Sequence, residues 1–138
     1  MSAFVLDTSA TLAWFFEDEA SDAGWELLAS AQQAGVWVPS LWALEVGNIL
    51  LAAERRQRTT AARIAAFIDE LADMPINVDQ ETMARAMRDV LMLARAERLT
   101  TYDAAYLELA MRRGLPLATK DAALAAAARR IGVEVSVP

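Results

Sequence analysis

The sequence predicts an α/β fold: a three-layer domain with a central, mainly parallel sheet of four or five strands and helices on both faces. Short apolar runs alternate with longer segments of helical periodicity along the 138 residues. Several of these runs lead directly into helix-capping residues, as strands of a parallel sheet do. No change of composition or linker interrupts the alternation, so we expect one domain over residues 1–138.

The predicted strands are short apolar runs, which are typical of strands buried on both faces. The first run ends at Asp7, and the fourth leads into Asp121. The second run stands directly before Pro39. The five runs cover residues 3–6, 36–38, 75–78, 117–119 and 133–135.

Helix signals occupy the intervals between these strands. After the first strand, Thr8 or Ser9 can cap a helix. A helix over about residues 21–34 stops at Gly35, a residue suited to the left-handed conformation beyond a helix end. Residues 41–57 form a helix that is apolar on nearly every side.

The second half of the chain continues the same alternation. A polar helix over about residues 60–73 precedes the third strand, and Asp79 can cap the next helix. The helix that begins near Tyr102 ends at Gly114, and the last, alanine-rich helix ends at Gly132. The helix after Asp79 has an amphipathic stripe that we expect to pack in the core. This stripe consists of Met83, Met87, Val90, Leu91 and Ala94.

The chain contains no cysteine and no histidine. Thiolate catalysis, zinc sites built from Cys or His, catalytic triads and histidine general bases are therefore excluded. Any chemistry must use carboxylates, hydroxyls, amides, Arg, Tyr or the single lysine, Lys120. Because carboxylates are hard oxygen ligands, the metal that such a site favours is Mg²⁺ or Mn²⁺.

The formal net charge of −6 argues against non-specific nucleic-acid binding through a broadly basic surface. Positive charge is nevertheless concentrated locally. The arginines of residues 55–58 fit either a solvated helix end or a grip on phosphates or an acidic partner. The arginine clusters are Arg55, Arg56, Arg58 and Arg63, then Arg112 and Arg113, then Arg129 and Arg130.

Composition also bears on location. Hydrophobic residues make up 56% of the chain and charged residues 23%, which is typical of a folded protein. No apolar run approaches the roughly 20 residues needed to cross a bilayer, and the N-terminus lacks the basic leader of a secretory signal. We therefore expect a cytoplasmic protein that is not bound to a membrane.

Four carboxylates lie where the predicted fold can gather them. Asp7 closes the first strand and Asp121 starts the helix after the fourth, and parallel α/β sheets bind ligands outside the carboxyl ends of their strands. Asp103 is in the first turn of its helix. Glu45 and Asn48 are three residues apart in an otherwise apolar helix, so they share one helix face. One edge of the sheet could collect all four acids.

Such a set of acids favours metal-dependent chemistry. Carboxylates at close range raise one another's pKa, and a divalent ion removes this repulsion. Mg²⁺ typically takes one or two carboxylates, with waters and phosphate oxygens as its other ligands. An ion bound in this way activates a water and stabilises charge on a pentacovalent phosphorus. The set therefore favours phosphodiester hydrolysis, which needs no histidine.

Each acid also has a structural explanation. Asp103 in a first helical turn complements the helix dipole, and Asp121 is in the position of an ordinary N-cap. Glu45 fits a partly exposed helix residue. Asp7, which follows an apolar strand, favours a ligand role most strongly. No single position decides between the two explanations.

The four acids lie in the segments VLDTSA at residues 5–10, ALEVGNIL at 43–50, TTYDAAYLELA at 100–110 and LATKDAALAAAARRIGVEV at 117–135. These segments resemble the motif regions of PIN-domain nucleases. Within that family they look like the VapC-type toxins of bacterial toxin–antitoxin pairs. The resemblance covers essentially the whole chain, and the order, spacing and context of the four acids all match.

The resemblance implies a PIN-like domain whose acids are catalytic and bind Mg²⁺, with Mn²⁺ as a substitute. By position, Asp7 and Asp103 look like the principal metal ligands. Glu45 and Asp121 look like the acids that complete the pocket, directly or through water, and Asp121 could serve a second ion. Polar side chains that orient the acids or the attacking water are implied at Ser9, Asn48 and Thr119.

The resemblance further implies an endoribonuclease that cleaves RNA and acts as a homodimer. It implies a small antitoxin protein that wraps the toxin and blocks its site, often by inserting an arginine among the carboxylates. Two alternatives are a PIN nuclease of RNA processing without an antitoxin and a non-catalytic interaction module that has kept the fold.

Two other phosphate-handling classes fit the residues less well. A receiver-type signalling domain needs a paired acid after the first strand, where Thr8 and Ser9 follow Asp7, and an acceptor Asp after the third, where Asp79 is poorly placed. A haloacid-dehalogenase-type phosphatase needs a second Asp two residues after the first, where this chain has Ser9.

Overall fold

The computed structural model describes residues 2–138 and contains a five-stranded sheet. All neighbouring strands in it are parallel, so the predicted α/β fold with a parallel sheet is confirmed. The strands are β1 (Phe4–Leu6), β2 (Val36–Val38), β3 (Ile76–Val78), β4 (Leu117–Ala118) and β5 (Val135–Ser136). Their order across the sheet is β3-β2-β1-β4-β5.

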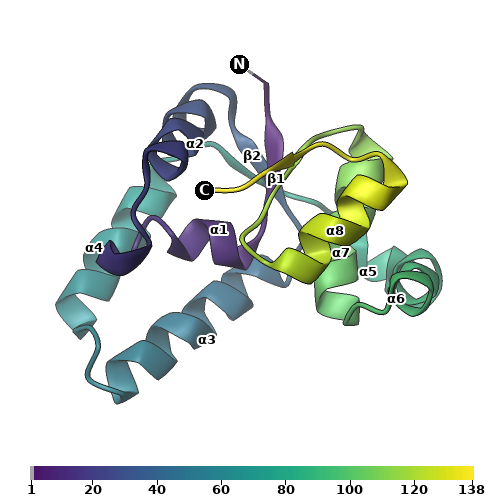
Figure 1. Ribbon diagram of the computed structural model, residues 1–138. Coiled ribbons are helices and arrows are strands. Elements are labelled where there is room, and N and C mark those ends of the chain that lie inside the picture. The colour runs from purple at the N-terminus through teal and green to yellow at the C-terminus, as the bar shows by residue number, and fades with distance from the viewer. Residues whose placement is uncertain (1) are drawn as a thin grey trace.

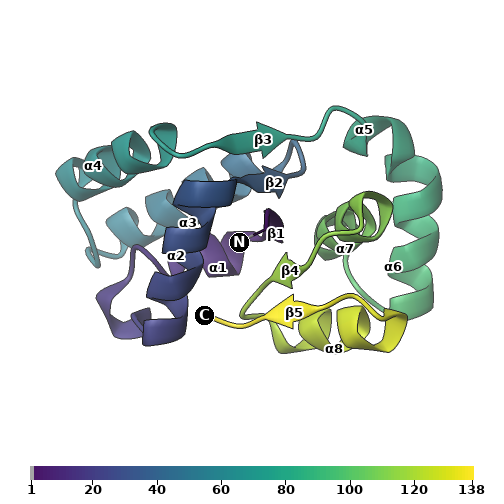
Figure 2. The ribbon, with the colours of Figure 1, turned by 90° about the horizontal axis from the view of Figure 1, so that it is seen from above.

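Helices cover both faces of the sheet, as the sequence predicts. They are α1 (Thr8–Leu12), η1 (Glu17–Glu19), α2 (Asp22–Ala34), α3 (Trp42–Arg55), α4 (Ala61–Ala72), α5 (Thr82–Arg85), η2 (Ala86–Val90), α6 (Leu91–Glu97), α7 (Thr101–Arg113) and α8 (Ala122–Ile131). Figure 1 and Figure 2 show α1 to α4 on one side of the sheet and α5 to α8 on the other. None of the helices in residues 2–138 has the length and hydropathy needed to cross a bilayer.

The chain builds the sheet outward from β1 in two directions. It passes from β1 to β2 and β3 on one side, then returns through α5, α6 and α7 to β4 on the other side of β1. The strand order therefore reverses between β1 and β4, and this reversal point is where open α/β sheets bind ligands. Val5 and Leu6 of β1 are completely buried, so this central strand gives the site a rigid base.

Two helices end directly before a glycine, as the sequence predicts. Gly35 after α2 and Gly114 after α7 have φ values of 84° and 65°, a conformation that residues with a Cβ rarely adopt. A Cβ on Gly35 would also lie 3.0 Å from the Pro75 carbonyl oxygen. The helices therefore stop where the sequence predicts.

The predicted core role of Met83 and Met87 is wrong, because these side chains are 71% and 81% exposed. The turn η2 between α5 and α6 is π-helical, so its hydrogen bonds span five residues instead of four. This turn shifts the buried face by one position, and Thr82 rather than Met83 is buried with Val90 and Ala94. The prediction assumed an uninterrupted α-helix.

The start of β5 and the cap of α5 also differ from the prediction. The Val133 N–H donates to the Ala128 carbonyl at 2.9 Å, so Val133 completes the end of α8 and β5 begins at Val135. Asp79 lies three residues before α5 and accepts a hydrogen bond from the Thr82 hydroxyl at 2.8 Å. It stabilises the approach to α5 rather than acting as its N-cap.

Candidate active site

Asp7 and Asp121 lie at the point where the strand order reverses. Asp7 directly follows β1, and Asp121 lies three residues after β4. Because these strands pair in parallel, with Leu6 opposite Ala118, both segments leave the sheet at the same edge. The fold thus brings together two acids from opposite ends of the chain.

Asp7 is buried, at 4% exposure, and both of its carboxylate oxygens accept hydrogen bonds. Its Oδ1 accepts from the Ala10 N–H and the Ser9 hydroxyl, both at 2.8 Å. Its Oδ2 accepts a short hydrogen bond from the Thr119 hydroxyl. Burial, and to a smaller extent the charge of Asp121, raises the pKa of Asp7, while the hydrogen bonds oppose that rise. The carboxylate is therefore held in one orientation at an electrostatic cost.

Glu45 projects from the first turn of α3, and two hydroxyls hold one of its oxygens. The Tyr106 hydroxyl donates to Glu45 Oε1 at 2.5 Å, and the Thr8 hydroxyl donates to the same oxygen at 3.1 Å. The two hydroxyls are 2.9 Å apart. Burial, followed by the hydrogen bond to Glu45, raises the pKa of Tyr106. The phenol therefore stays protonated and continues to donate to Glu45.

The charges of the other three acids act on Asp103. It lies in the first turn of α7, where its N–H donates to the capping Thr100 hydroxyl at 3.1 Å. The pKa of Asp103 is raised to about 6, chiefly by burial and then by the charges of Asp121, Asp7 and Glu45. Each of these acids therefore lies close enough to repel the Asp103 carboxylate. The four acids form one electronegative group, which we call the four-acid site.

Asp121 combines a structural role with a place in this site. Its Oδ1 accepts a hydrogen bond from the Leu124 N–H at 2.8 Å, which makes it the N-cap of α8. Capping uses a single oxygen, and none of the hydrogen bonds in residues 2–138 uses Asp121 Oδ2. The side chain is exposed, so its second oxygen is accessible to a ligand.

The three expected supporting residues are placed differently from one another. Ser9 and Thr119 contact Asp7 directly, and their hydroxyls are 3.3 Å apart. Asn48 is exposed on α3, and within residues 2–138 its side chain makes no hydrogen bond to the acids. It lines a hollow with Ser9 instead. The fold therefore gathers Ser9 and Thr119 around Asp7 but leaves Asn48 beside the site.

Sequence reasoning missed the hydroxyls of Tyr106 and Thr8 as partners of Glu45. A signal for Tyr106 was present, because it lies three residues after Asp103 and shares its face of α7. For Thr8, which directly follows Asp7, the sequence predicts only a helix-capping role and gives no signal for the contact with Glu45. A tyrosine on the same helix face as Asp103 is a candidate hydrogen-bond donor to a neighbouring acid, which here is Glu45.

The donor set fits a hard divalent cation, although no closed ligand cage is preformed. In the part of the chain that the structure describes, no three acidic side chains converge as a ready metal-binding group. Mg²⁺ needs only one or two direct carboxylates because it keeps several waters. The mutual repulsion that raises the pKa of Asp103 is the condition that a divalent cation relieves. The arrangement therefore agrees with a few direct ligands and bound waters.

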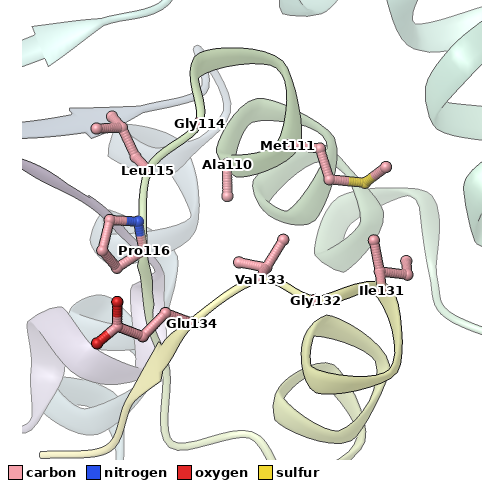
Figure 3. Close-up of a pocket in the computed structure, with 9 residues that line it drawn as sticks. All are labelled: Ala110, Met111, Gly114, Leu115, Pro116, Ile131, Gly132, Val133 and Glu134. Atoms are coloured by element: carbon pink, nitrogen blue, oxygen red, sulfur yellow. The ribbon is translucent and has the colours of Figure 1, made fainter.

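A second hollow, of about 480 Å³, lies at the amino end of β4, away from the four-acid site. It is bounded by the ends of α7 and α8 and by the segments that enter β4 and β5 (Figure 3). Figure 3 shows the apolar side chains of Met111, Ile131 and Val133 at this hollow, with the Glu134 carboxylate pointing away from them. Of the described residues that line it, none is one of the four acids.

Comparisons with known proteins agree with this arrangement. The PIN domain family matches residues 4–130. Ribonuclease VapC3 from Pyrobaculum aerophilum is 31% identical over 121 residues, which are 88% of this chain and 91% of that protein. The crystal structure of PAE2754 from Pyrobaculum aerophilum has a TM-score of 0.72 at 25% identity and covers 99% of this chain and 92% of its own. FitAcB from Neisseria gonorrhoeae, with a TM-score of 0.55 and 18% identity over 98% of this chain and 96% of its own, shares the fold alone.

The family match contains all four acids and spans most of the chain. The similarity to the curated relative extends over nearly the whole length of both proteins. The resemblance that the four sequence segments carry is therefore confirmed. The chain belongs to the PIN domain family and is a nuclease of the VapC type.

Proposed function

We propose that this chain is an endoribonuclease that hydrolyses RNA phosphodiester bonds with Mg²⁺, or with Mn²⁺ as a substitute. The proposed catalytic and metal-binding residues are Asp7, Glu45, Asp103 and Asp121. The observation that carries this proposal is that Asp7 and Asp121 leave two paired parallel strands at the same edge of the sheet; the charges of both, with that of Glu45, also help to raise the pKa of Asp103. It supports a single electronegative site at the ligand-binding edge of the sheet. The similarity to a ribonuclease supports RNA as the substrate.

In this proposal the four acids have two different roles. Asp7 and Asp103 are the principal metal ligands, and Glu45 and Asp121 complete the pocket directly or through water. The chemistry that a bound divalent ion supplies is polarisation of the phosphate and a lower pKa for the attacking water.

Hydroxyl groups of this chain keep the acids in position. Ser9 and Thr119 hold the carboxylate of Asp7, and Tyr106 holds Oε1 of Glu45. Glu45 Oε2 takes part in none of the hydrogen bonds of residues 2–138. One oxygen of Glu45 is thus fixed, while the other is available to accept a proton from the attacking water.

We also propose that a cognate antitoxin protein inhibits this nuclease and that its active form is a homodimer. The similarity to a VapC protein supports the antitoxin, and the homodimer rests on the family resemblance alone. A PIN nuclease of RNA processing without an antitoxin is the alternative, and it uses the same site. A cytoplasmic location stays a prediction. A neighbouring short reading frame for a DNA-binding protein would favour the toxin pair.

Incubation of the purified, partner-free chain with labelled single-stranded RNA tests the nuclease proposal. We expect cleavage with Mg²⁺ or Mn²⁺, arrest on addition of EDTA, and recovery when excess Mg²⁺ is restored. Gel analysis of the RNA fragments gives the rate. Undiminished cleavage in EDTA would overturn the metal requirement. A folded protein that cleaves no RNA with either ion would overturn the proposed metal-dependent RNA hydrolysis.

A further inference from the structure

A groove of about 390 Å³ lies beside the four-acid site, and residues of both α1 and α3 line it. These two helices contact each other in the lower part of Figure 1. Ser9, whose hydroxyl donates to Asp7 at 2.8 Å, lines the groove, as do Asn48 and Arg56 of the α3 segment. The groove, which we call the Arg56 groove, is therefore connected to Asp7 through Ser9, although none of the four acids is among the described residues that line it.

One face of α3 connects the acids with the arginines. Glu45, Asn48, Ala52 and Arg56 follow one another at intervals of three, four and four residues, so they share a helix face. At a rise of 1.5 Å per residue, about 16 Å separate Glu45 and Arg56 along the helix axis. With a rise of about 3.4 Å or more per nucleotide, about five nucleotides or fewer span this distance.

The far part of the groove is positively charged. Arg56 and Arg58 line it and are exposed, and neither takes part in an ion pair within residues 2–138. The acid of the groove, Glu19, already pairs with Lys120 at 2.8 Å. In a chain of net charge −6, two neighbouring cations without an acidic partner in one groove fit an anionic ligand.

The rest of the wall is largely apolar. Leu12 and Ile49 line it, and the Arg58 guanidinium lies 5.0 Å from the centre of the Phe16 ring. Apolar and aromatic surface beside exposed cations is how proteins hold single-stranded nucleic acid, because bases stack on the rings and phosphates pair with the cations. Since Ser9, which holds the Asp7 carboxylate, also lines the groove, these features favour RNA over an acidic protein segment.

We propose that the Arg56 groove binds the single-stranded RNA on one side of the scissile phosphate, with Arg56 and Arg58 on backbone phosphates and Asn48 beside the reacting nucleotide. This inference rests on the proposed ribonuclease function and adds the path of the substrate. Phosphate contacts position the strand but carry little sequence information. The groove therefore contributes affinity and register, while base specificity arises elsewhere.

The test measures the binding of a fluorescent single-stranded oligoribonucleotide to the full chain by anisotropy, in EDTA, so that neither metal nor cleavage contributes. We compare the double variant Arg56→Gln and Arg58→Gln with a control of equal charge, Arg55→Gln and Arg129→Gln. Arg55 and Arg129 do not line the groove. We expect the groove variant to raise the Kd about tenfold and to reduce the slope of log Kd against log salt by about 1.4, since each phosphate contact on a single strand contributes about 0.7.

Cleavage assays with Mg²⁺ complete the test. The groove variant should raise KM and leave kcat unchanged, because the arginines lie away from the reacting atoms. Equal weakening of binding by groove and control variants would overturn the proposal, as would unchanged binding by the groove variant. Groove-dependent RNA binding without cleavage would instead overturn the proposed RNA hydrolysis, and with it the path to the scissile phosphate, and leave the groove only as an RNA-binding surface. Circular dichroism of each variant verifies folding.

Discussion

The molecule contains two clusters of acidic side chains that differ in their counter-charges. In the four-acid site, none of the acids takes part in an ion pair within residues 2–138. In the second cluster, which we call the Asp79 cluster, Arg112 binds Asp79 and Glu108, each at 2.8 Å. Hydrogen bonds from Arg112 lower the pKa of Asp79, whereas burial and like charges raise that of Asp103 to about 6.

This difference separates a structural cluster from a ligand site. In the Asp79 cluster, arginine occupies the lone pairs of the acids, so the charges connect the approach to α5 with α7 and have no capacity for a metal. The four-acid site keeps its repulsion, because none of its acids is paired with a cation within residues 2–138. Such perturbed acids are typical of functional sites, where binding of a ligand offsets the strain.

The largest expected effect is the loss of cleavage in Asp7→Asn. This change keeps the hydrogen-bond acceptor for Ala10 and removes the charge, so we expect RNA cleavage to fall by at least about a hundredfold. The urea midpoint should stay the same or rise, because a buried carboxylate with a raised pKa is removed. Rate assays and urea titration measure both effects.

The control for this prediction is the same substitution in the other cluster. Asp79→Asn should leave the cleavage rate unchanged and lower the urea midpoint, because Arg112 loses a charged partner. Cleavage by Asp7→Asn at the parental rate would refute the metal assignment, whatever Asp79→Asn does.

The next effect concerns stability when Arg112 is replaced by Met. The side chain of Asp79 is completely shielded from solvent, and it would lose its principal counter-charge. We expect the free energy of unfolding to fall by about 2–3 kcal/mol. Combining Arg112→Met with Asp79→Asn should recover part of this loss, as a double-mutant cycle in urea can measure. A loss below about 0.5 kcal/mol would mean that the pairing does not stabilise the fold.

A smaller effect is expected for Tyr106→Phe, which removes the hydroxyl that positions Glu45. We expect kcat for RNA cleavage to fall about tenfold with little change in KM. Tyr102→Phe is the matched control, because Tyr102 is 62% exposed on the same helix. In a Glu45→Gln background, Tyr106→Phe should have no further effect. An additional tenfold loss in that background would show that Tyr106 does not act through Glu45.

The smallest expected effect is an opposite pH dependence of stability in the two clusters. Because folding raises the pKa of Asp103, its contribution to the free energy of unfolding is highest below pH 4, where this carboxyl is protonated. That contribution falls as pH rises through about 6 and the carboxyl ionises. We expect about 1 kcal/mol after screening, and Asp103→Asn should abolish it. The lowered pKa of Asp79 contributes stability above pH 4 that is lost as pH falls.

Urea midpoints of the parent and of both variants, measured in EDTA between pH 3 and pH 8, test this prediction. The gap between the parent and Asp79→Asn should narrow toward pH 3, whereas that between the parent and Asp103→Asn should open between about pH 4 and pH 6 and stay constant above that. If the urea midpoints of all three proteins depend on pH in the same way, the two clusters do not differ electrostatically.

The candidate site was predictable where a residue's position depends on its neighbours in sequence. Asp7 and Asp121 could be located because each follows a short apolar strand and precedes a helix. The bond between Tyr106 and Glu45 could not be derived in the same way, because it joins α7 to α3. Asn48 shares a helix face with Glu45 but makes no hydrogen bond to the acids within residues 2–138, so its supporting role stays a prediction.

The sequence by itself determined the succession of strands and helices along the chain and where most of them end. It also determined the edge of the sheet at which Asp7 and Asp121 lie. These features depend on periodicity, caps and glycine conformations within a few residues. Only the tertiary structure decided which acids have counter-charges and which methionines are exposed. The physical reason is that a pKa and a buried area depend on groups from distant segments, as when Arg112 reaches Asp79 or the turn η2 rotates Met83 to the surface.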